Sequence, residues 1–401
     1  MAIVHPFKAI RPTRDKVNLV ASRSYLSYSD ETLKEKLEHN PFTFLHIINP
    51  DYKDKIKLKG IEKFKIVKNK FNEFIDKKYL IQDKKEAFYI YQQQNTTHTF
   101  NGIIAATSVA DYLNGNIKKH EHTITAREEM FKDYLNTTGF NADPVLLSYQ
   151  KENSINSILS KYQVSRAEYE FTTTNKSLHK LWVIQDSTDI KLITDAFKNI
   201  KSLYIADGHH RCSSSALLTE TNNTKLSKYF MSFLIAEDQL NIINFNRLIK
   251  GLNNLSANEF LLKLKSSFQL SETSNCNPVN EDEIGMYLEG KCYLLTAKKG
   301  SYKSDCVNRL DPAILSNNIL NPILNITDEK TDKNISFIAG NIPISELKTK
   351  VDCGKFTIAF ILKPIPFSAI KEVADNNRFM PPKSTYIEPK LRSGLTIYPL
   401  Q

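Results

Sequence analysis

The pattern of apolar and polar positions is helical over parts of the N-terminal third. Between Glu62 and Leu80, apolar residues recur at helical spacing with lysines on the other face, which predicts an amphipathic helix. Ser29, with two acidic residues after it, predicts a capped helix that Pro41 ends. Residues 1–28 predict extended chain because their prolines disfavour helix. The apolar run at 42–51 predicts a buried strand.

Further along, short apolar runs alternate with helical patterns. Strands are expected at 88–91, 103–107, 144–149, 169–173, 181–185 and 203–205. Helices are expected at 108–115, 125–138, 154–162 and 189–200. A β-rich stretch at 229–245 and helical patterns at 258–268 and 313–320 follow. This alternation predicts an α+β, mixed α/β protein.

The segment Leu203 to Leu217, LYIADGHHRCSSSAL, predicts a strand, a glycine turn and the start of a helix. The first N–H groups of a helix lack partners and carry its positive dipole end, so this arrangement favours an anion. Gly208 allows close approach of a phosphate, and Arg211 can add a bidentate contact. Between them, His209 and His210 can donate hydrogen bonds or transfer protons. The alternative is a plain Asp-Gly turn with two exposed histidines.

A second polar stretch, IKKHEHT at 117–123, directly precedes a predicted helix. Thr125 and Glu128 form a capping-box pattern at its start, and Gly139 closes it. The His-Glu-His triplet at 120–122 therefore lies where polar side chains can converge on a ligand. The alternative is a surface loop.

A third stretch, MPPKSTYIEPKLRSGL at 380–395, carries cations and hydroxyls between three prolines. These residues are Lys383, Lys390 and Arg392, with Ser384 and Thr385. Cations and hydroxyls in a rigid loop suit phosphate binding. The alternative is a basic tail, but the strand-like LTIYPL that follows favours a structured role. We predict that Lys383 and Lys390 fold back onto the Asp-Gly turn and complete a phosphate site.

Composition limits the class of protein. Hydrophobic residues make up 41% and charged residues 24% of 401, which is typical of a soluble globular chain. No apolar run has the length of a membrane span or of a signal-peptide core, so a cytoplasmic protein is expected. The net charge of +10 is spread along the chain, and nucleic acid is not expected as a partner. The five scattered cysteines favour reduced thiols and predict neither a zinc ribbon nor a disulfide framework.

Several common motifs are absent from the sequence. The chain has no GxxxxGK[ST], no GxGxxG after a strand, and no HExxH, GxSxG or HRD/DFG set. An enzyme that handles nucleotides with this sequence therefore does so with a less common site.

Five segments carry a family resemblance: NPFTFLHIINPD, IKKHEHT, LYIADGHHR, LDPAILSNNILNPIL and MPPKSTYIEPKLRSGL. In this order they resemble a bacterial and archaeal family known only as a domain of unknown function and often labelled ParB-like. The DGHHR block is also similar to the DGHxR block of the ParB/sulfiredoxin-like free serine kinases, where this turn holds nucleotide phosphates. The resemblance implies a ParB/sulfiredoxin-like nucleotide-binding core within a larger, multi-domain, mixed-sheet α+β protein.

Three parts of the chain are expected on this basis. Residues 1–95 form an N-terminal α/β part, and residues 96–225 form the ParB/sulfiredoxin-like catalytic core. Residues 226–401 form a C-terminal α+β part whose end, 377–401, returns to the active site. The length of 401 residues is enough for such a division.

The resemblance implies a small-molecule kinase that transfers phosphate from ATP or ADP, with Mg²⁺, to the hydroxyl of free L-serine and forms O-phosphoserine. Glu121 would accept the hydroxyl proton, Asp207 would orient it or help hold the metal, and His210 would complete the catalytic set. The phosphate-binding set would be Gly208, His209, Arg211, Lys383, Ser384, Thr385 and Lys390. His120 and Thr123 would bind the acceptor. The metal ligands and the oligomeric state stay open.

One departure from the family concerns the N-terminus. The family usually reads PPYD there, whereas this chain has Arg23-Ser24-Tyr25-Leu26, with no aspartate. If that aspartate binds metal or substrate, the substrate has changed or activity is lost.

Two other functions remain as alternatives. A ParB-like, nucleotide-dependent DNA-binding protein would fit the label and the charge, but no helix-turn-helix or concentrated basic face supports it. A metal-dependent hydrolase would use His120, His122, His209 and His210 as ligands for zinc or manganese. Adjacent histidines point in different directions unless the loop bends.

Overall fold

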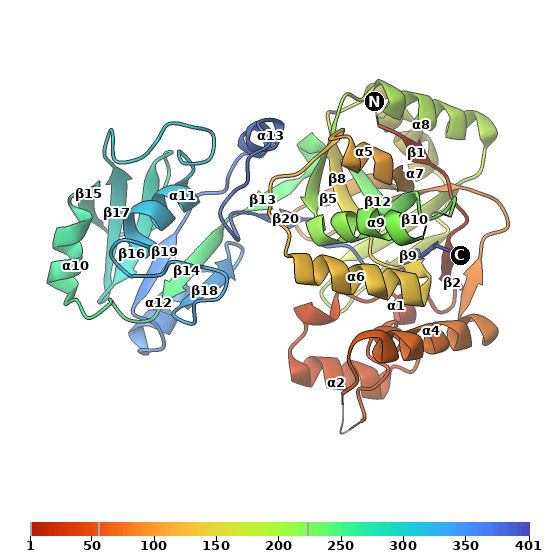
Figure 1. Cartoon of the computed structure of the whole chain (residues 1–401), viewed down its shortest axis with the longest axis horizontal. Coiled ribbons are helices and arrows are strands. Elements are labelled where there is room, and N and C mark those ends of the chain that lie inside the picture. The colour runs from red at the N-terminus through yellow and green to blue at the C-terminus, as the bar shows by residue number, and fades with distance from the viewer. Residues whose placement is uncertain (1, 55–56, 223) are drawn as a thin grey trace. The chain divides into compact units, whose positions relative to one another are not determined.

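A computed structural model of the chain describes residues 2–54, 57–222 and 224–401. The chain divides into two compact units (Figure 1). Unit 1 comprises Met1–Leu240 with Pro389–Gln401, and unit 2 comprises Asn241–Glu388. The expected boundary at residue 95 is not where the structure divides, because β4 (Phe88–Gln94) and β5 (Thr99–Ser108) pair in one sheet.

Unit 1 is built on a nine-stranded mixed sheet in the order β6-β11-β8-β12-β5-β4-β10-β9, with β1 paired to β5. The remaining strands are β1 (Val4–His5), β6 (Ile117–Lys118), β8 (Val145–Tyr149), β9 (Tyr169–Thr172), β10 (Leu178–Ile184), β11 (Leu203–Asp207) and β12 (Tyr229–Ala236). The pairs β6–β11 and β8–β12 are parallel, and β11–β8 and β12–β5 are antiparallel. This sheet confirms the mixed α/β class.

Helices cover this sheet. They are α5 (Val109–Leu113), α6 (Thr125–Thr138), α7 (Asn153–Gln163), α8 (Ser187–Asn199) and α9 (His209–Thr221). Helix α9 packs against α5 and α6, while α7 packs against α8. Strands β8 and β12 are apolar almost throughout because both faces of the sheet are covered. Cys212 on α9 is a buried member of this core.

The N-terminal region adds a smaller helical cluster to unit 1. Its elements are β2 (Ile10–Pro12), α1 (Val17–Val20), a 3₁₀ turn (Tyr25–Ser27), α2 (Asp30–His39), α3 (Leu45–Ile48), α4 (Gly60–Asp76) and β3 (Leu80–Gln82). The side chain of Ser29 accepts a hydrogen bond from the Thr32 backbone, which confirms the predicted cap of α2. The prediction of extended chain over residues 1–28 is wrong at α1 and at the 3₁₀ turn.

The strand predicted at 42–51 is wrong, because the structure has turns and α3 there. Phe44 and Ile47 enter a core shared with α4, including Phe71. A short apolar run indicates that the segment is buried, but it does not distinguish a buried strand from a buried helical turn.

Unit 2 contains a six-stranded antiparallel sheet in the order β15-β17-β16-β19-β14-β18 and a two-stranded pair, β13-β20. The strands are β13 (Asn241–Ile243), β14 (Phe245–Ile249), β15 (Phe268–Thr273), β16 (Glu283–Leu288), β17 (Lys291–Ala297), β18 (Ile335–Ala339), β19 (Ile358–Ile361) and β20 (Tyr386–Glu388). The helices are α10 (Ala257–Leu264), α11 (Asp311–Leu315) with a π-helical continuation (Ser316–Leu320), α12 (Ile344–Asp352) and α13 (Phe367–Asp375).

Unit 2 also holds a disulfide between Cys276 and Cys292, so the expectation of reduced cysteines is wrong for this pair. Cys292 lies on β17, whose hairpin partner is β16. The Cys276 backbone lies against Gly285 of β16, where a side chain would not fit. This packing brings the two Cα atoms to 5.1 Å, a proximity that no spacing motif reveals.

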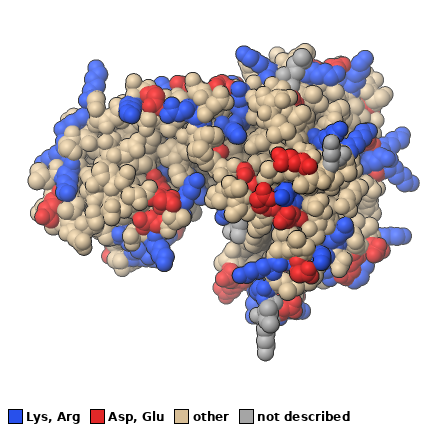
Figure 2. Space-filling model, viewed as in Figure 1, with Lys and Arg blue, Asp and Glu red and all other residues tan. Residues whose placement is uncertain are grey.

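The charged side chains are dispersed over the face drawn in Figure 2. On this face, lysines and arginines are interspersed with acidic and uncharged residues. Across the described parts of the chain, no helix has both the length and the apolar character that crossing a membrane demands.

Candidate functional site

The Asp-Gly turn has the predicted form: β11 ends at Asp207, and α9 begins at His209. Gly208, between them, has a φ of 98°, in the left-handed region that favours glycine. A Cβ at this position would lie 2.9 Å from the guanidinium of Arg211. The backbone conformation therefore favours glycine here, and a larger residue would also displace the Arg211 guanidinium.

The His-Glu segment reaches this turn because β6 runs parallel to β11. Ile117 pairs with Leu203, and Lys118 pairs with Tyr204. Parallel neighbours end at the same edge of a sheet. The residues that follow Lys118 therefore lie beside the end of β11 and the start of α9.

The carboxylate of Asp207 is bound by two cations. Arg211 Nη2 lies 3.0 Å from Oδ2, and Lys390 Nζ lies 3.3 Å from Oδ1. Burial alone would raise the pKa of Asp207, but Lys390 and Arg211 outweigh it and hold the pKa below its ordinary value. Lys390 comes from the C-terminal segment of unit 1. The structure thus brings together Asp207, Gly208, Arg211 and Lys390 of the predicted set.

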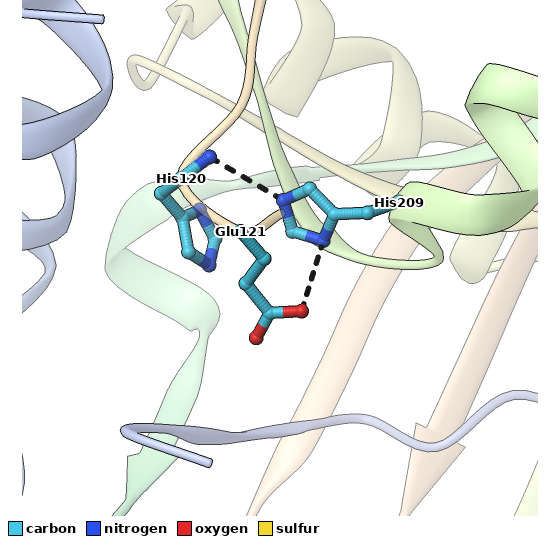
Figure 3. Close-up of side chains that lie close together, drawn as sticks. All are labelled: His120, Glu121 and His209. Carbon is cyan, nitrogen blue, oxygen red and sulfur yellow. Dashed lines mark hydrogen bonds and ion pairs between the residues drawn. The ribbon is translucent and has the colours of Figure 1, made fainter. Parts of the chain in front are cut away.

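His120, Glu121 and His209 form a cluster beside this turn (Figure 3). Nδ1 of His209 lies 3.4 Å from Glu121 Oε2. Nε2 of His209 accepts a long hydrogen bond, 3.5 Å, from the backbone N–H of His120. The two imidazole rings meet edge to face, with centroids 4.6 Å apart. Both ring nitrogens of His209 thus face the 120–121 segment.

Burial sets the protonation of the two histidines. It lowers the pKa of His120 and of His209 to about 3, so both rings are neutral at pH 7. A neutral ring has one donor and one acceptor nitrogen. Because Nε2 of His209 accepts, its Nδ1 carries the proton and faces Glu121. Glu121 itself is 45% exposed and so reaches solvent.

His210 connects the turn to the start of α6. Its Nε2 accepts a hydrogen bond of 3.0 Å from the backbone N–H of Ile124, the residue that precedes α6. The capping box predicted from Thr125 is not formed, because Thr125 is already helical and Ile124 occupies the N-cap. Thr123, the predicted acceptor contact, is half-buried beside Ile124. The catalytic role of His210 stays a prediction.

The cluster has the composition of a metal site. Ligand atoms of His120, Glu121 and His209 all lie within 4.8 Å of one another. Both ring nitrogens of His120 are buried and have no hydrogen-bond partner among the described residues. Of the four histidines that the hydrolase alternative needed, this group contains two.

The remaining predicted phosphate ligands belong to unit 2. Lys383 Nζ lies over the ring of Phe245, 5.4 Å from its centroid. Ser384 donates a hydrogen bond to the Pro381 carbonyl, and Thr385 is buried. Their role in the phosphate site stays a prediction.

One partner of the site is not visible in the sequence. Arg211 also donates a hydrogen bond to the carbonyl of Pro144, at the start of β8. A backbone carbonyl leaves no signature in residue type. The parallel pairing of β6, a strand of two residues, was too short for an apolar pattern to predict.

Comparisons with known proteins give one family and a set of remote structures. A family model described as "Protein of unknown function (DUF1015)" matches residues 4–313. No curated protein matches the chain. A free serine kinase in complex with AMP is similar at 12% identity and a TM-score of 0.39, over 75% of this chain and 92% of that one. A conserved hypothetical protein from Pyrococcus furiosus is similar at 14% identity and a TM-score of 0.36, over 72% of this chain and 91% of that one. SbnI with a C-terminal truncation, from Staphylococcus aureus, is similar at 13% identity and a TM-score of 0.37, over 74% of this chain and 87% of that one. At these TM-scores the structures carry no argument about this chain.

Proposed function

Because the chain belongs to the DUF1015 family, a family of unknown function, its activity must be inferred from its site, and we propose a phosphotransferase that uses ATP or ADP. The acceptor is the hydroxyl of a small molecule, L-serine or a close relative. The observation that carries the proposal is the glycine turn at the N-terminus of α9, with Arg211 and Lys390 beside it.

The turn supplies what a bound phosphate needs. The first N–H groups of α9 point out of the helix with its positive dipole end. Asp207 pairs with both Arg211 and Lys390, and the three side chains together keep a net positive charge. When phosphates arrive, these two cations turn from the carboxylate to the phosphate oxygens, for which their geometry is equally suited.

Once Arg211 and Lys390 have moved to the phosphates, the carboxylate oxygens of Asp207 can coordinate a magnesium ion. Carboxylate oxygen is the ligand that Mg²⁺ prefers, and the ion would supply neutralisation of the charge on the phosphates. The chain's own residues then do the rest of the work, which in phosphoryl transfer consists mainly of positioning.

Glu121 is the proposed base. It takes the proton of the acceptor hydroxyl while that oxygen bonds to the terminal phosphorus and the bond to the bridging oxygen of the donor breaks. Nδ1 of His209 lies 3.4 Å from Glu121 Oε2, from where its N–H would hold that oxygen and leave Oε1 for the proton. His209 therefore serves as a positioning residue for Glu121.

Phosphate transfer can be tested directly. The full chain would be incubated with ATP or ADP, Mg²⁺ and a panel of hydroxyl compounds that includes L-serine, L-threonine and ethanolamine. We expect O-phosphoserine, detected by mass spectrometry, and its loss in Glu121→Gln. Absence of a phosphorylated product with both donors and every acceptor would reject the proposal.

A metal-dependent hydrolase is a second candidate, favoured by the grouping of His120, Glu121 and His209. The hydrogen bond into His209 Nε2 opposes it, because that bond leaves the proton, and no lone pair, on the nitrogen that faces Glu121. Elemental analysis of the purified protein distinguishes the two. One equivalent of zinc or manganese, lost in His120→Ala, would favour the hydrolase.

A further inference from the structure

Two arginines lie next to the point where the N-terminal and C-terminal segments of unit 1 pair. Ser22 and Ser393 form an antiparallel bridge with both backbone hydrogen bonds, 3.1 and 2.8 Å. The bridge is isolated, and the residues next to it on one side lie close enough for their charges to act on each other. These residues are Arg23 and Arg392.

Among the described residues, the pair has no counter-ion. Arg392 is 8% exposed, and within that part of the chain its guanidinium donates a hydrogen bond only to the amide oxygen of Asn175, at 3.3 Å. The guanidinium of Arg23 lies over the ring of Tyr28, 4.8 Å from the centroid. Burial is the main cause that lowers the pKa of Arg392; Tyr91 and Tyr28 oppose it, and the charge of Arg23 adds to it. No carboxylate in the described ranges lies within ion-pair distance of either arginine.

Elsewhere in unit 1 the fold gives a buried arginine its carboxylates. Arg11 is equally buried, and it binds Asp83 at 2.9 Å and Glu168 at 3.0 Å. Like charges held close together repel, and a buried charge without a counter-ion is costly. The Arg23–Arg392 pair therefore has the properties expected of an anion-binding site.

The arginine pair adjoins the Asp-Gly turn through one short segment. Ser393 donates a hydrogen bond to the Asp143 carboxylate, and the Gly394 backbone donates to the Ala142 carbonyl. The next residue, Pro144, accepts the hydrogen bond from Arg211. Residues 142–144 thus contact the C-terminal segment on one side and the turn on the other.

We propose that Arg23 and Arg392 form a carboxylate-binding subsite that holds the carboxylate of the small-molecule acceptor. This inference rests on the proposed phosphotransferase, and it adds which residues hold the acceptor and by which of the acceptor's groups. A planar guanidinium matches a carboxylate in bidentate fashion. The donor's phosphates already have α9, Arg211 and Lys390, so the second cationic site is left for a second anionic group.

The subsite is tested by ligand titration of the full chain, saturated with ADP and Mg²⁺. L-serine is compared with ethanolamine, which has the same hydroxyl and amine but no carboxylate. We expect at least a 50-fold weaker affinity for ethanolamine. Arg392→Gln and Arg23→Gln should each weaken L-serine binding at least tenfold and change the affinity for ADP less than twofold. Arg14→Gln is the matched control, because Arg14 is exposed and pairs with Glu168.

The possible failures are distinguishable. Equal binding or equal phosphorylation of ethanolamine and L-serine would overturn the subsite and leave the phosphotransferase standing. Loss of ADP affinity in the two variants would assign the arginines to the nucleotide and overturn the subsite as well. If the wild type transfers phosphate to no acceptor, the proposed function fails, and tight binding of L-serine that depends on both arginines would still support the subsite. Two variants are used because Arg23 is less buried than Arg392, so its replacement is easier for the fold to accommodate.

Discussion

At the scale of single residues, Gly208 shows how local strain and the site are connected. Its φ of 98° strains any L side chain, and its lack of a Cβ makes room for the Arg211 guanidinium. The sequence predicted the turn from the Asp-Gly pair. It could not predict that the space over Gly208 is filled by the arginine four residues along.

Gly208→Ala should lower the free energy of unfolding by about 1–2 kcal/mol and also weaken ADP binding, because the new methyl displaces Arg211. Gly115→Ala is the control, since Gly115 also has a positive φ, 74°, but open space at the Cβ position. We expect similar destabilisation in urea unfolding and unchanged ADP affinity for Gly115→Ala. Equal ADP affinities for both variants would show that the position of Arg211 does not matter for nucleotide binding.

Arg211→Ala should weaken ADP binding about tenfold to a hundredfold, the loss expected for hydrogen bonds to a charged group. Calorimetric titration measures it. Arg14→Ala removes an exposed arginine elsewhere in unit 1 and should leave the affinity unchanged. An Arg211→Ala protein that binds ADP like the wild type would contradict the assignment of this arginine.

At the scale of elements, the sequence predicted best where a single helix or strand shows its own period or cap. The strands β4, β5, β8 and β11 and the capped helix α2 fall where their patterns placed them. The sequence failed where tertiary packing decides, as at α3, whose apolar run enters a helical core. The site followed the same rule, because the two polar segments were visible and the parallel β6–β11 pair that joins them was not.

One buried carboxylate joins α7 and α8. Asp189 on α8 accepts hydrogen bonds from Lys161 Nζ at 2.8 Å and from Tyr162 Oη at 2.8 Å, both of α7. The hydrogen bond from Lys161 is the main cause that lowers the pKa of Asp189. A lowered pKa in the folded state means that the stabilisation is complete above the unfolded pKa of about 3.9 and is lost as pH falls through the folded value.

Asp189→Asn should therefore destabilise the protein by about 1–3 kcal/mol at pH 7. In thermal unfolding, the difference from the wild type should persist down to about pH 5 and shrink below about pH 4. Asp195→Asn on the same helix is the control, because Asp195 is half exposed and should show no measurable change. A difference that does not depend on pH would show that the charge of Asp189 is not what joins the helices.

At the scale of the whole molecule, the chain folds as two units whose boundaries the composition did not reveal. Unit 1 closes when its C-terminal segment returns, through Lys390 at Asp207 and Ser393 at Ser22. A long-range return of this kind has no local signal. The disulfide of unit 2 had none either, since its two cysteines are 16 residues apart and share no motif.

The central claim is that the turn between β11 and α9 holds the donor's phosphates. A crystal structure of the full chain with ADP and Mg²⁺ tests it most directly. We predict terminal phosphate oxygens within hydrogen-bond distance of the first backbone N–H groups of α9, with the Arg211 guanidinium moved from Asp207 to the phosphates. ADP bound elsewhere, or a turn that keeps its Asp207–Arg211 pair with ADP bound, would contradict the account.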